Sequence, residues 1–295
     1  NFYFHEQIEE FLITLQDSAG NFAIPRRFVY DGELPSRPDI NSVSGGQINV
    51  SDVDSIGTTP ITISGNHNDA NDKVGFQILN YNDDALLSIN DLSVDSGTGT
   101  WSYSLTSADI EALSSATGDP LVQDLEKRLR VRAFATDFAG NRSDEFGHGP
   151  DKEFVFDLEA PSTPSVVEVR STVVIDDGHG GSYSDHRNIN PDNAGNYVLN
   201  DPTPTISATS NFGDSFGGGN ASFELQLDVN GSWQTILSKE AWTYENHNSF
   251  DIGSPLSEQQ NQLRLVATDS VGNSSVSPTF VLDVDLTPPT LPTLS

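Results

Sequence analysis

The 295-residue sequence contains no cysteine, so no disulfide can stiffen it and no thiol can bind a metal or act as a nucleophile. Basic residues are few, because 14 lysines and arginines stand against 43 aspartates and glutamates, a formal net charge of −29. This balance argues against nucleic acid and anionic membrane surfaces as partners and favours cations. Any metal bound here must therefore be a hard one with oxygen ligands.

Long hydrophobic runs and methionine are absent as well. No apolar run approaches the roughly 18 to 20 residues that span a bilayer, and no signal peptide opens the chain, so we expect no membrane insertion. Because even an initiator methionine is missing, we expect an internal piece of a longer polypeptide. H-E-x-x-H, G-x-S-x-G and Walker motifs are also missing, so the sequence does not indicate an enzyme.

What the chain does contain is a pair of motifs that occur three times. The first is a strand-like segment that ends in a D-x-x-G-N turn, at 17–21, 137–141 and 269–273. The second is a strand-like segment that leaves through an acidic exit followed by proline, at 28–35, 154–161 and 280–288. The turn aspartates are 120 and 132 residues apart and the exit aspartates 126 and 126, so the repeating unit has the size of a domain.

Between these motifs, short β-type runs alternate with clusters of Gly, Asn, Asp and Ser. In Leu129–Thr136 every second residue is apolar, which is the pattern of a half-buried strand. Further strands are predicted at 47–50, 60–64, 74–79, 101–105, 153–156, 165–169, 204–207, 223–227 and 242–244. Asn230-Gly231 predicts a hairpin turn, and Thr106-Ser-Ala-Asp109 predicts a capping box before a short helix. The predicted fold class is all-β, with tandem immunoglobulin-like (Ig-like) β-sandwich domains arranged as a rod.

The repeats divide the chain into four parts. Residues 1–38 match only the last third of a domain and are expected to be the C-terminal part of a truncated Ig-like domain. Residues 39–161 and 162–287 are predicted to be two Ig-like domains, and 288–295 a linker to a further domain. A long polar insert at 176–200 distinguishes the last unit from the middle one.

Three features together carry a family resemblance: the L-R-[VL] strand leading to D-x-x-G-N, the F-V-x-D-x-[DE] exit followed by proline, and W-x-Y in an earlier strand. The chain resembles the bacterial Ig-like repeats of giant non-fimbrial adhesins exported by type I secretion, such as that of Salmonella. The resemblance implies calcium at the domain junctions, a secreted or bacterial cell-surface location, and a part in cell adhesion and virulence. It also implies a monomer whose partners are neighbouring Ig-like domains and a host-cell glycan or protein.

The residues give a separate reason to expect Ca²⁺. In an Ig-type sandwich each D-x-x-G-N turn lies where the chain enters, and so faces the acidic exit of the previous domain. Grouped carboxylates repel without a counterion, whereas Ca²⁺ takes about six to eight oxygen ligands. The predicted metal ligands are Asp17, Asp31, Glu33, Asp137, Asp157, Glu159, Asp269, Asp283 and Asp285. The competing interpretation is that D-x-x-G-N is only a favourable turn and the exits are solvated linkers.

Other loop acids are weaker candidates. They are expected either where the chain enters a domain, as for Asp69, Asp72 and Asp214, or at the exit end, as for Asp52 and Asp54. Each of them is more often a solvated acid than a ligand.

The insert and two tryptophans leave alternatives open. The insert contains the ligand types of a zinc site, in Asp176, Asp177, His179, Asp185 and His186. A flexible glycine-rich loop is the alternative. Trp101 and Trp242 are either sugar-stacking platforms or buried aromatics between sheets.

Three functions compete. The first is a calcium-stiffened stalk of a surface adhesin, which holds a binding region away from the cell or contributes to it. The second is a module that binds a glycan or protein through the insert and exposed aromatics. The third is a set of accessory domains of a secreted hydrolase. We favour the first, because it accounts for the repeated acidic exits.

Overall fold

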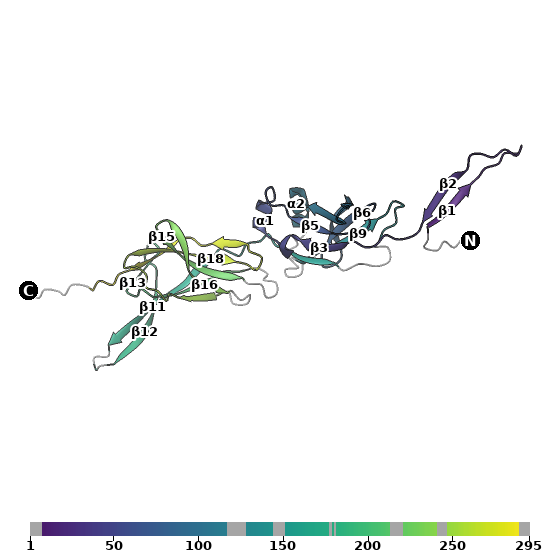
Figure 1. Cartoon of the computed structure of the whole chain (residues 1–295). Coiled ribbons are helices and arrows are strands. Elements are labelled where there is room, and N and C mark those ends of the chain that lie inside the picture. The colour runs from purple at the N-terminus through teal and green to yellow at the C-terminus, as the bar shows by residue number, and fades with distance from the viewer. Residues whose placement is uncertain are drawn as a thin grey trace, which may run out of the picture. The chain divides into compact units, whose positions relative to one another are not determined.

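The computed structural model describes residues 8–116, 128–143, 151–176, 179, 181–212, 221–240 and 247–288. The chain is almost entirely β-structure and divides into two compact units, Asn1–Asp157 and Leu158–Ser295 (Figure 1). This division lies close to the predicted boundary at 161–162. None of the described helices is long and apolar enough to cross a membrane.

The first unit contains a separate hairpin and a sandwich of two sheets. The hairpin consists of β1 (Ile8–Ile13) and β2 (Arg26–Asp31), paired antiparallel. The sandwich strands are β3 (Asp39–Val43), β4 (Gln47–Ile48), β5 (Thr62–Asn66), β6 (Lys73–Leu79), β7 (Ala85–Ser93), β8 (Thr100–Ser104), β9 (Arg128–Thr136) and β10 (Lys152–Phe156). One sheet has the order β4-β10-β9-β6-β7 and the other β3-β5-β8, and β10 pairs with β4 in parallel.

Alternating apolar residues form the core between these sheets. In β9, Leu129, Val131 and Ala135 are fully buried, as the alternation predicts. Trp101 of β8 is 1% exposed, and its ring stacks on that of Phe76 with centroids 6.1 Å apart. Trp101 is therefore a buried inter-sheet aromatic, and the sugar-platform alternative is wrong for this residue.

The helices of the first unit are short and are fixed by side-chain caps. Helix α2 (Ser107–Ala116) has the predicted capping box, because Thr106 N donates to Asp109 Oδ2 at 2.8 Å and Asp109 N donates to Thr106 Oγ1 at 3.2 Å. Helix α1 (Val50–Asp54) follows a 3₁₀ turn, η1 (Ser44–Gly46), and strand β4, and was not predicted. Its capping box joins Asn49 and Asp52, so the predicted strand at 47–50 ends two residues early.

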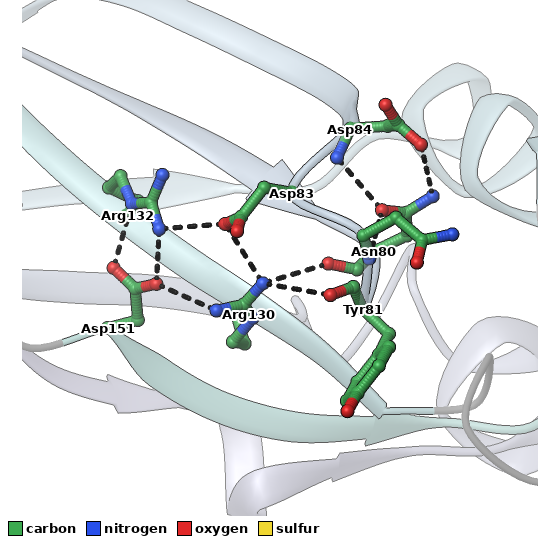
Figure 2. A network of polar contacts seen from close by, with 8 residues as sticks. Asn80, Tyr81, Asp83, Asp84, Arg130, Arg132 and Asp151 are labelled. Carbon is green, nitrogen blue, oxygen red and sulfur yellow. Dashed lines mark hydrogen bonds and ion pairs between the residues drawn. The ribbon is translucent and has the colours of Figure 1, made fainter.

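A balanced network of charges fixes the β6–β7 loop against β9 and β10 (Figure 2). Arg132 donates to Asp83 at 2.9 Å and to both oxygens of Asp151, at 3.0 and 2.8 Å. Arg130 reaches the same two aspartates, at 3.0 and 3.5 Å. Two cations and two anions neutralise one another, and the arginine side chains are largely covered. The hydrogen bond from Arg132 is the main reason that the pKa of Asp83 is lowered.

The second unit is also a two-sheet sandwich. Its strands are β11 (Ser165–Asp176), β12 (Ser182–Ile189), β13 (Asn196–Leu199), β14 (Thr205–Thr209), β15 (Ser222–Val229), β16 (Ser232–Glu240), β17 (His247–Asp251), β18 (Gln260–Thr268), β19 (Ser274–Val276) and β20 (Phe280–Val284). One sheet has the order β12-β11-β14-β17 and the other β13-β20-β18-β15-β16, with β19 beside β18. The predicted turn between β15 and β16 is present, because Asn230 and Gly231 both have positive φ, 56° and 83°. The core is built around Phe223 and Phe250, whose ring centroids are 5.7 Å apart.

The insert contains β12 and β13, so the prediction of a flexible glycine-rich loop is wrong for Ser182–Ile189 and Asn196–Leu199, whereas residues 177, 178 and 180 lie outside the described residues. β11 pairs with β14 only as far as Arg170 and then continues to Asp176 with β12 as its partner. Buried Asp201 holds the point of departure, since its Oδ2 accepts from Thr172 N at 2.7 Å and its Oδ1 accepts from Thr203 N at 2.8 Å. Residues 182–189 and 196–199 are therefore held by strand pairing, although glycines lie next to these strands in the sequence.

Candidate functional site

The D-x-x-G-N turn of the first unit is closed by the side chains of its first and last residues. Asp137 Oδ1 accepts from Asn141 N at 2.9 Å, and its Oδ2 accepts from the Asn141 side-chain amide at 2.8 Å. Gly140 has a φ of 94°, a conformation that favours glycine. The aspartate and the glycine together hold the Asn141 side chain in one position.

The equivalent turn of the second unit is more buried and more completely bonded. Asp269 is 5% exposed and Asn273 is 3% exposed. Asp269 Oδ1 accepts from the main-chain N–H groups of Val271, Gly272 and Asn273 at 2.8 to 3.0 Å. Its Oδ2 accepts from the Asn273 side-chain amide at 2.9 Å. Four donors therefore share this one carboxylate.

The first copy of the turn is closed by the same two end residues but lies exposed. Asp17 Oδ1 accepts from Ala19 N and Asn21 N at 2.9 and 2.8 Å, and Oδ2 accepts from the Asn21 side chain at 2.8 Å. The side-chain hydrogen bond from Asn21 is the main reason that the pKa of Asp17 is lowered. The turn therefore forms its internal bonds whether it is exposed or buried.

The structure also contains two turns of this kind that the sequence analysis missed. Asp192–Asn196, between β12 and β13, is a fourth D-x-x-G-N, and its exposed Asp192 accepts from Ala194 N and Asn196 N at 2.8 Å. Asn80–Asp84, between β6 and β7, has the two end residues exchanged. Its Asn80 Oδ1 accepts from Asn82 N and Asp84 N at 2.9 Å, and its side-chain amide donates to Asp84 Oδ2 at 3.1 Å. The turn by itself is thus a general loop structure of this chain.

What sets the Asp137–Asn141 turn apart is its contact with the segment that enters the sandwich. The Asn141 side-chain amide donates to the main-chain carbonyls of Asp31 at 2.9 Å and Glu33 at 3.2 Å. Further along the same segment, Arg37 Nε donates to Ser143 O at 3.1 Å. The structure therefore brings the turn and the acidic exit of β2 together within the first unit.

The second unit repeats this contact at its own turn. The Asn273 side-chain amide donates to Glu159 O at 3.3 Å, and Ser275 Oγ donates to Ser162 O at 3.0 Å. Ser162 is also held from the other sheet, because its N–H donates to Asn211 O at 2.7 Å. In both units the incoming chain is bonded through its backbone to the D-x-x-G-N loop.

The acidic side chains of the exits are placed differently from one another. Asp31 ends β2, and its Oδ1 accepts from Glu33 N at 3.1 Å, while the Glu33 residue is exposed. Asp157 is 7% exposed at the end of the first unit, where its N–H donates to Ile48 O at 3.0 Å. The Glu159 residue is exposed and begins the second unit.

At the last exit, strand pairing differs from the sequence alignment. Asp283 lies within β20, opposite Val198, and its Oδ2 accepts from Gln260 Nε2 at 3.3 Å. Asp285 N donates to Leu199 O at 2.9 Å, which is the bond that Asp157 makes to Ile48. The main chain therefore aligns Asp285 with Asp157, whereas the motif aligns Asp283. A cavity of about 310 Å³ is lined by Asp285, Ser171 and the cationic Arg187 among others.

The donor chemistry of these sites fits a hard cation. Around Asn141 the available groups are the carboxylates of Asp31, Glu33 and Asp137 and main-chain carbonyls, all oxygen donors of the kind that Ca²⁺ takes. Within the described parts of the chain, however, no three acidic or histidine side chains are already gathered into a metal site. Binding would thus require the exit carboxylates to turn toward the ion, and Arg187 makes the cavity beside Asp285 a poorer site.

The weaker candidates in the first unit have protein partners. Asp72 is buried against His67, with Nε2 and Oδ2 2.7 Å apart. Asp69 accepts from the main chain and side chain of Asn71, and Asp52 caps α1. Asp54 lies exposed at the end of α1.

The zinc hypothesis for the insert has no support in the described residues. Asp185 pairs with Arg187 Nε at 2.7 Å, and His186 Nδ1 lies 3.1 Å from Thr172 Oγ1. These side chains are thus engaged along the β11–β12 hairpin, and no metal-binding group is found there among the residues that the structure describes. Asp177, Asp214, Trp242 and the end of the predicted linker lie outside the described residues.

No model of a protein family matches the sequence, and no curated protein is significantly similar to it. Several solved structures are similar to the chain at low sequence identity. One, titled for the host cell surface retention of a 1.5-MDa bacterial ice-binding adhesin, is 19% identical with a TM-score of 0.35, over 85% of this chain and 66% of that one. Fibronectin(III)-like modules of Clostridium thermocellum CbhA are 15% identical with a TM-score of 0.36, over 84% and 94% of the two chains.

A tetra-tandem repeat from the extending region of a large adhesion protein is 15% identical with a TM-score of 0.28, over 95% of this chain and 83% of that one. The identities to these three structures are all below 20%, and the TM-scores are all below 0.5.

Proposed function

We propose that this chain is a calcium-stiffened segment of Ig-like repeats from a bacterial surface adhesin, acting as a stalk that presents or contributes to host-cell binding. The observation that carries the proposal is the repeated contact between a D-x-x-G-N turn and an acidic incoming segment, at Asn141 and at Asn273. A domain array built to extend needs such contacts wherever the chain enters a domain, because domains joined only by free linkers reorient.

Calcium would add rigidity that hydrogen bonds alone do not give. Asp31, Glu33 and Asp137 would hold the ion in the first unit, and Asp269 with Glu159 in the second. When bound, the ion neutralises carboxylates that otherwise repel across the contact. Extracellular calcium sites commonly have Kd values of about 10⁻⁴ to 10⁻³ M, so millimolar calcium should add on the order of 1 kcal/mol of stability per site.

Such affinities suit export and action outside the cell. Sites of this strength stay empty at the low calcium concentration of a cytosol and fill in an extracellular medium, so the chain would stiffen only after secretion. The net charge of −29 supplies the field that attracts the ion. Secretion, a surface location, adhesion and a host-cell partner all belong to this proposal.

The test is calcium titration followed by thermal unfolding and small-angle scattering of the 295-residue chain. We expect heat of binding, a higher Tm in 2 mM calcium than in EDTA, and a narrower distribution of angles between the units when calcium is present. Asp137→Asn should remove binding in the first unit, whereas Asp192→Asn, in a turn with no incoming segment, should not. Equal Tm values and superimposable scattering curves with calcium and EDTA would exclude calcium stiffening.

The β11–β12 hairpin supports a second candidate function, the binding of a host-cell glycan or protein. Beyond Thr172, whose N–H is bonded to Asp201, the described pairing of β11 is with β12 and not with β14. Replacement of residues 174–184 by a short turn, which keeps the Thr172–Asp201 hydrogen bond, should leave the Tm of the second unit unchanged and abolish adhesion to host cells if the hairpin binds them. Unchanged adhesion would indicate that the segment has a purely structural function.

A further inference from the structure

We infer that Asn141 and Asn273 are hydrogen-bond clamps that hold the incoming chain on each sandwich without metal, and that Asp137 and Asp269 are the residues that position them. The inference deepens the proposed function, since it concerns the same contacts. It is independent of calcium, because every bond that defines a clamp joins protein atoms.

The clamp follows from how the two N–H groups of Asn141 are used. A side-chain amide nitrogen has two hydrogens. One is directed to Asp137 Oδ2 at 2.8 Å, which leaves the other to be shared between Asp31 O at 2.9 Å and Glu33 O at 3.2 Å. The carboxylate thus fixes the amide orientation, and the second hydrogen necessarily faces the incoming chain.

The second unit gives an independent instance. Asn273 divides its amide between Asp269 Oδ2 at 2.9 Å and Glu159 O at 3.3 Å. Glu159 and Glu33 occupy the same position of the repeated exit motif. Two units with different incoming sequences therefore use the same donor and the same acceptor position.

The remaining D-x-x-G-N turns show that this second contact does not come with the turn. Within the described part of the chain, the Asn21 and Asn196 side chains donate only to their own turn aspartates, at 2.8 and 3.5 Å. The clamp is therefore a property of the two turns that meet an incoming segment.

The partner that the Asn141 clamp fits is a segment that presents main-chain carbonyls two residues apart, and Asn273 binds the carbonyl at the second of these positions. Because carbonyls are bonded, the side chains of Asp31 and Glu33 are not consumed by the clamp and remain available to a cation. Arg37 and Ser275 add bonds on either side, at 3.1 and 3.0 Å, which restrict the direction in which the segment continues. The clamp sets the path of the chain, and calcium would act on a path already set.

Exchanging the aspartate and the asparagine at the two ends of the turn tests the clamp separately from the turn. Asn80–Asp84 shows that asparagine first and aspartate fifth still close this loop, but an aspartate at the fifth position has no hydrogen to donate. The double variant Asp137→Asn/Asn141→Asp should therefore keep the turn and lose the clamp. Asp137→Asn alone should lose both, because its amide would face that of Asn141.

The measurement is hydrogen–deuterium exchange of the full chain in EDTA. In the double variant we expect main-chain amides of residues 32–34, 36 and 37 to exchange roughly tenfold faster, which corresponds to the loss of about one net hydrogen bond. Amides of β6 and β9 should keep their protection, and those of residues 158–160 and 162 should not change. The matched control, Asp192→Asn/Asn196→Asp, should leave both incoming segments unaffected.

Unchanged exchange at 32–37 in a double variant that keeps β9 protected would overturn the clamp. If the double variant loses protection in β9, Asn141→Ser serves instead, because serine is too short to reach the carbonyls and removes no charge. Calcium titration of the unsubstituted chain decides the proposed function separately. Faster exchange without calcium binding leaves the clamp standing, and calcium binding with unchanged exchange leaves the proposed function standing.

Discussion

Asp269→Ala should destabilise the second unit far more than Asp192→Ala, although both remove the first residue of a D-x-x-G-N turn in the same unit. The difference lies in burial. Asp269 is 5% exposed, and its neighbours Val271 and Asn273 are also buried, whereas Asp192 is exposed. After substitution, water can reach the freed N–H groups at Asp192 and that of the exposed Gly272, but not those of the buried Val271 and Asn273.

The magnitude follows from the donors left behind. Removing the Asp269 carboxylate frees three main-chain N–H groups and one side-chain amide. A buried donor left without a partner costs about 1–3 kcal/mol, and neighbouring losses are less than additive, so we expect about 3–4 kcal/mol in total. Asp192→Ala should cost much less, because water replaces the hydrogen bonds of an exposed turn residue.

The assay is urea unfolding in EDTA, which removes any contribution from calcium, with Trp233 of β16 as a probe of the second unit. With a slope of about 1.5–2 kcal/mol per M for a unit of this size, Asp269→Ala should lower the midpoint by about 2 M and Asp192→Ala by less than about 0.5 M. The transition of the first unit serves as the internal control and should not move. Equal shifts for the two variants would refute the argument from burial.

Two further substitutions or conditions test the first unit. Gly65→Ala should lower the free energy of unfolding by about 3 kcal/mol, because a Cβ there would lie 1.8 Å from Asp39 O and 2.6 Å from the Trp101 ring. A variant with the same Tm as the unsubstituted chain would contradict this packing. Acid should destabilise the same unit through Asp109. Burial raises the pKa of this carboxyl, but the hydrogen bonds from Thr106 and Tyr103 lower it by more, so the pKa in the folded state lies below 3.8. The stability contributed by Asp109 is therefore complete above pH 3.8 and is lost as pH falls below it, so the Tm of Asp109→Asn should fall less steeply below pH 3.8 than the Tm of the unsubstituted chain.

Alternation and turn chemistry predicted much of the fold, and the misses have identifiable causes. β9 and the Asn230–Gly231 hairpin were found because local pattern and tertiary burial agree there. β7 was missed, since its pairing with β6 is irregular and Asp91 interrupts it with a φ of 61°. Helix α1 had a signal that was overlooked, the Asn49–Asp52 capping box, inside what looked like the end of a strand.

The insert was missed for a different reason. Its glycines and polar residues are typical of a loop, but β12 obtains its stability from pairing with an extended β11, a partner that no local pattern reveals. The point where β11 leaves β14 is held by Asp201, a single acid that bonds two main-chain donors from separate segments. Strand extension of this kind depends on tertiary contacts, so sequence alone favours the loop.

For the candidate site, the sequence predicted which segments meet, and the structure adds a direct contact that the sequence analysis did not name. The sequence analysis selected Asp137 and Asp269 because they are acidic. In the structure their carboxylate oxygens accept hydrogen bonds from their own turns. The contact with the incoming chain is made by the neutral residue at the other end of the motif, Asn141 or Asn273. Its presence in all three repeats was a usable signal, although the same asparagine is also sufficiently explained by turn formation.

The five turns together show why the motif could not by itself identify a junction. All five satisfy their internal hydrogen bonds in nearly the same way, in positions ranging from exposed at Asp17 to buried at Asp269. A loop that is complete in itself can be placed anywhere on a sandwich, and its fifth residue gains a second contact only where the topology brings another segment alongside. The acidic exit is what the sequence adds at those places, with main-chain carbonyls for the asparagine and carboxylates for a cation. The proposed function therefore depends on the pairing of the two motifs in space, and either motif alone is ordinary loop structure.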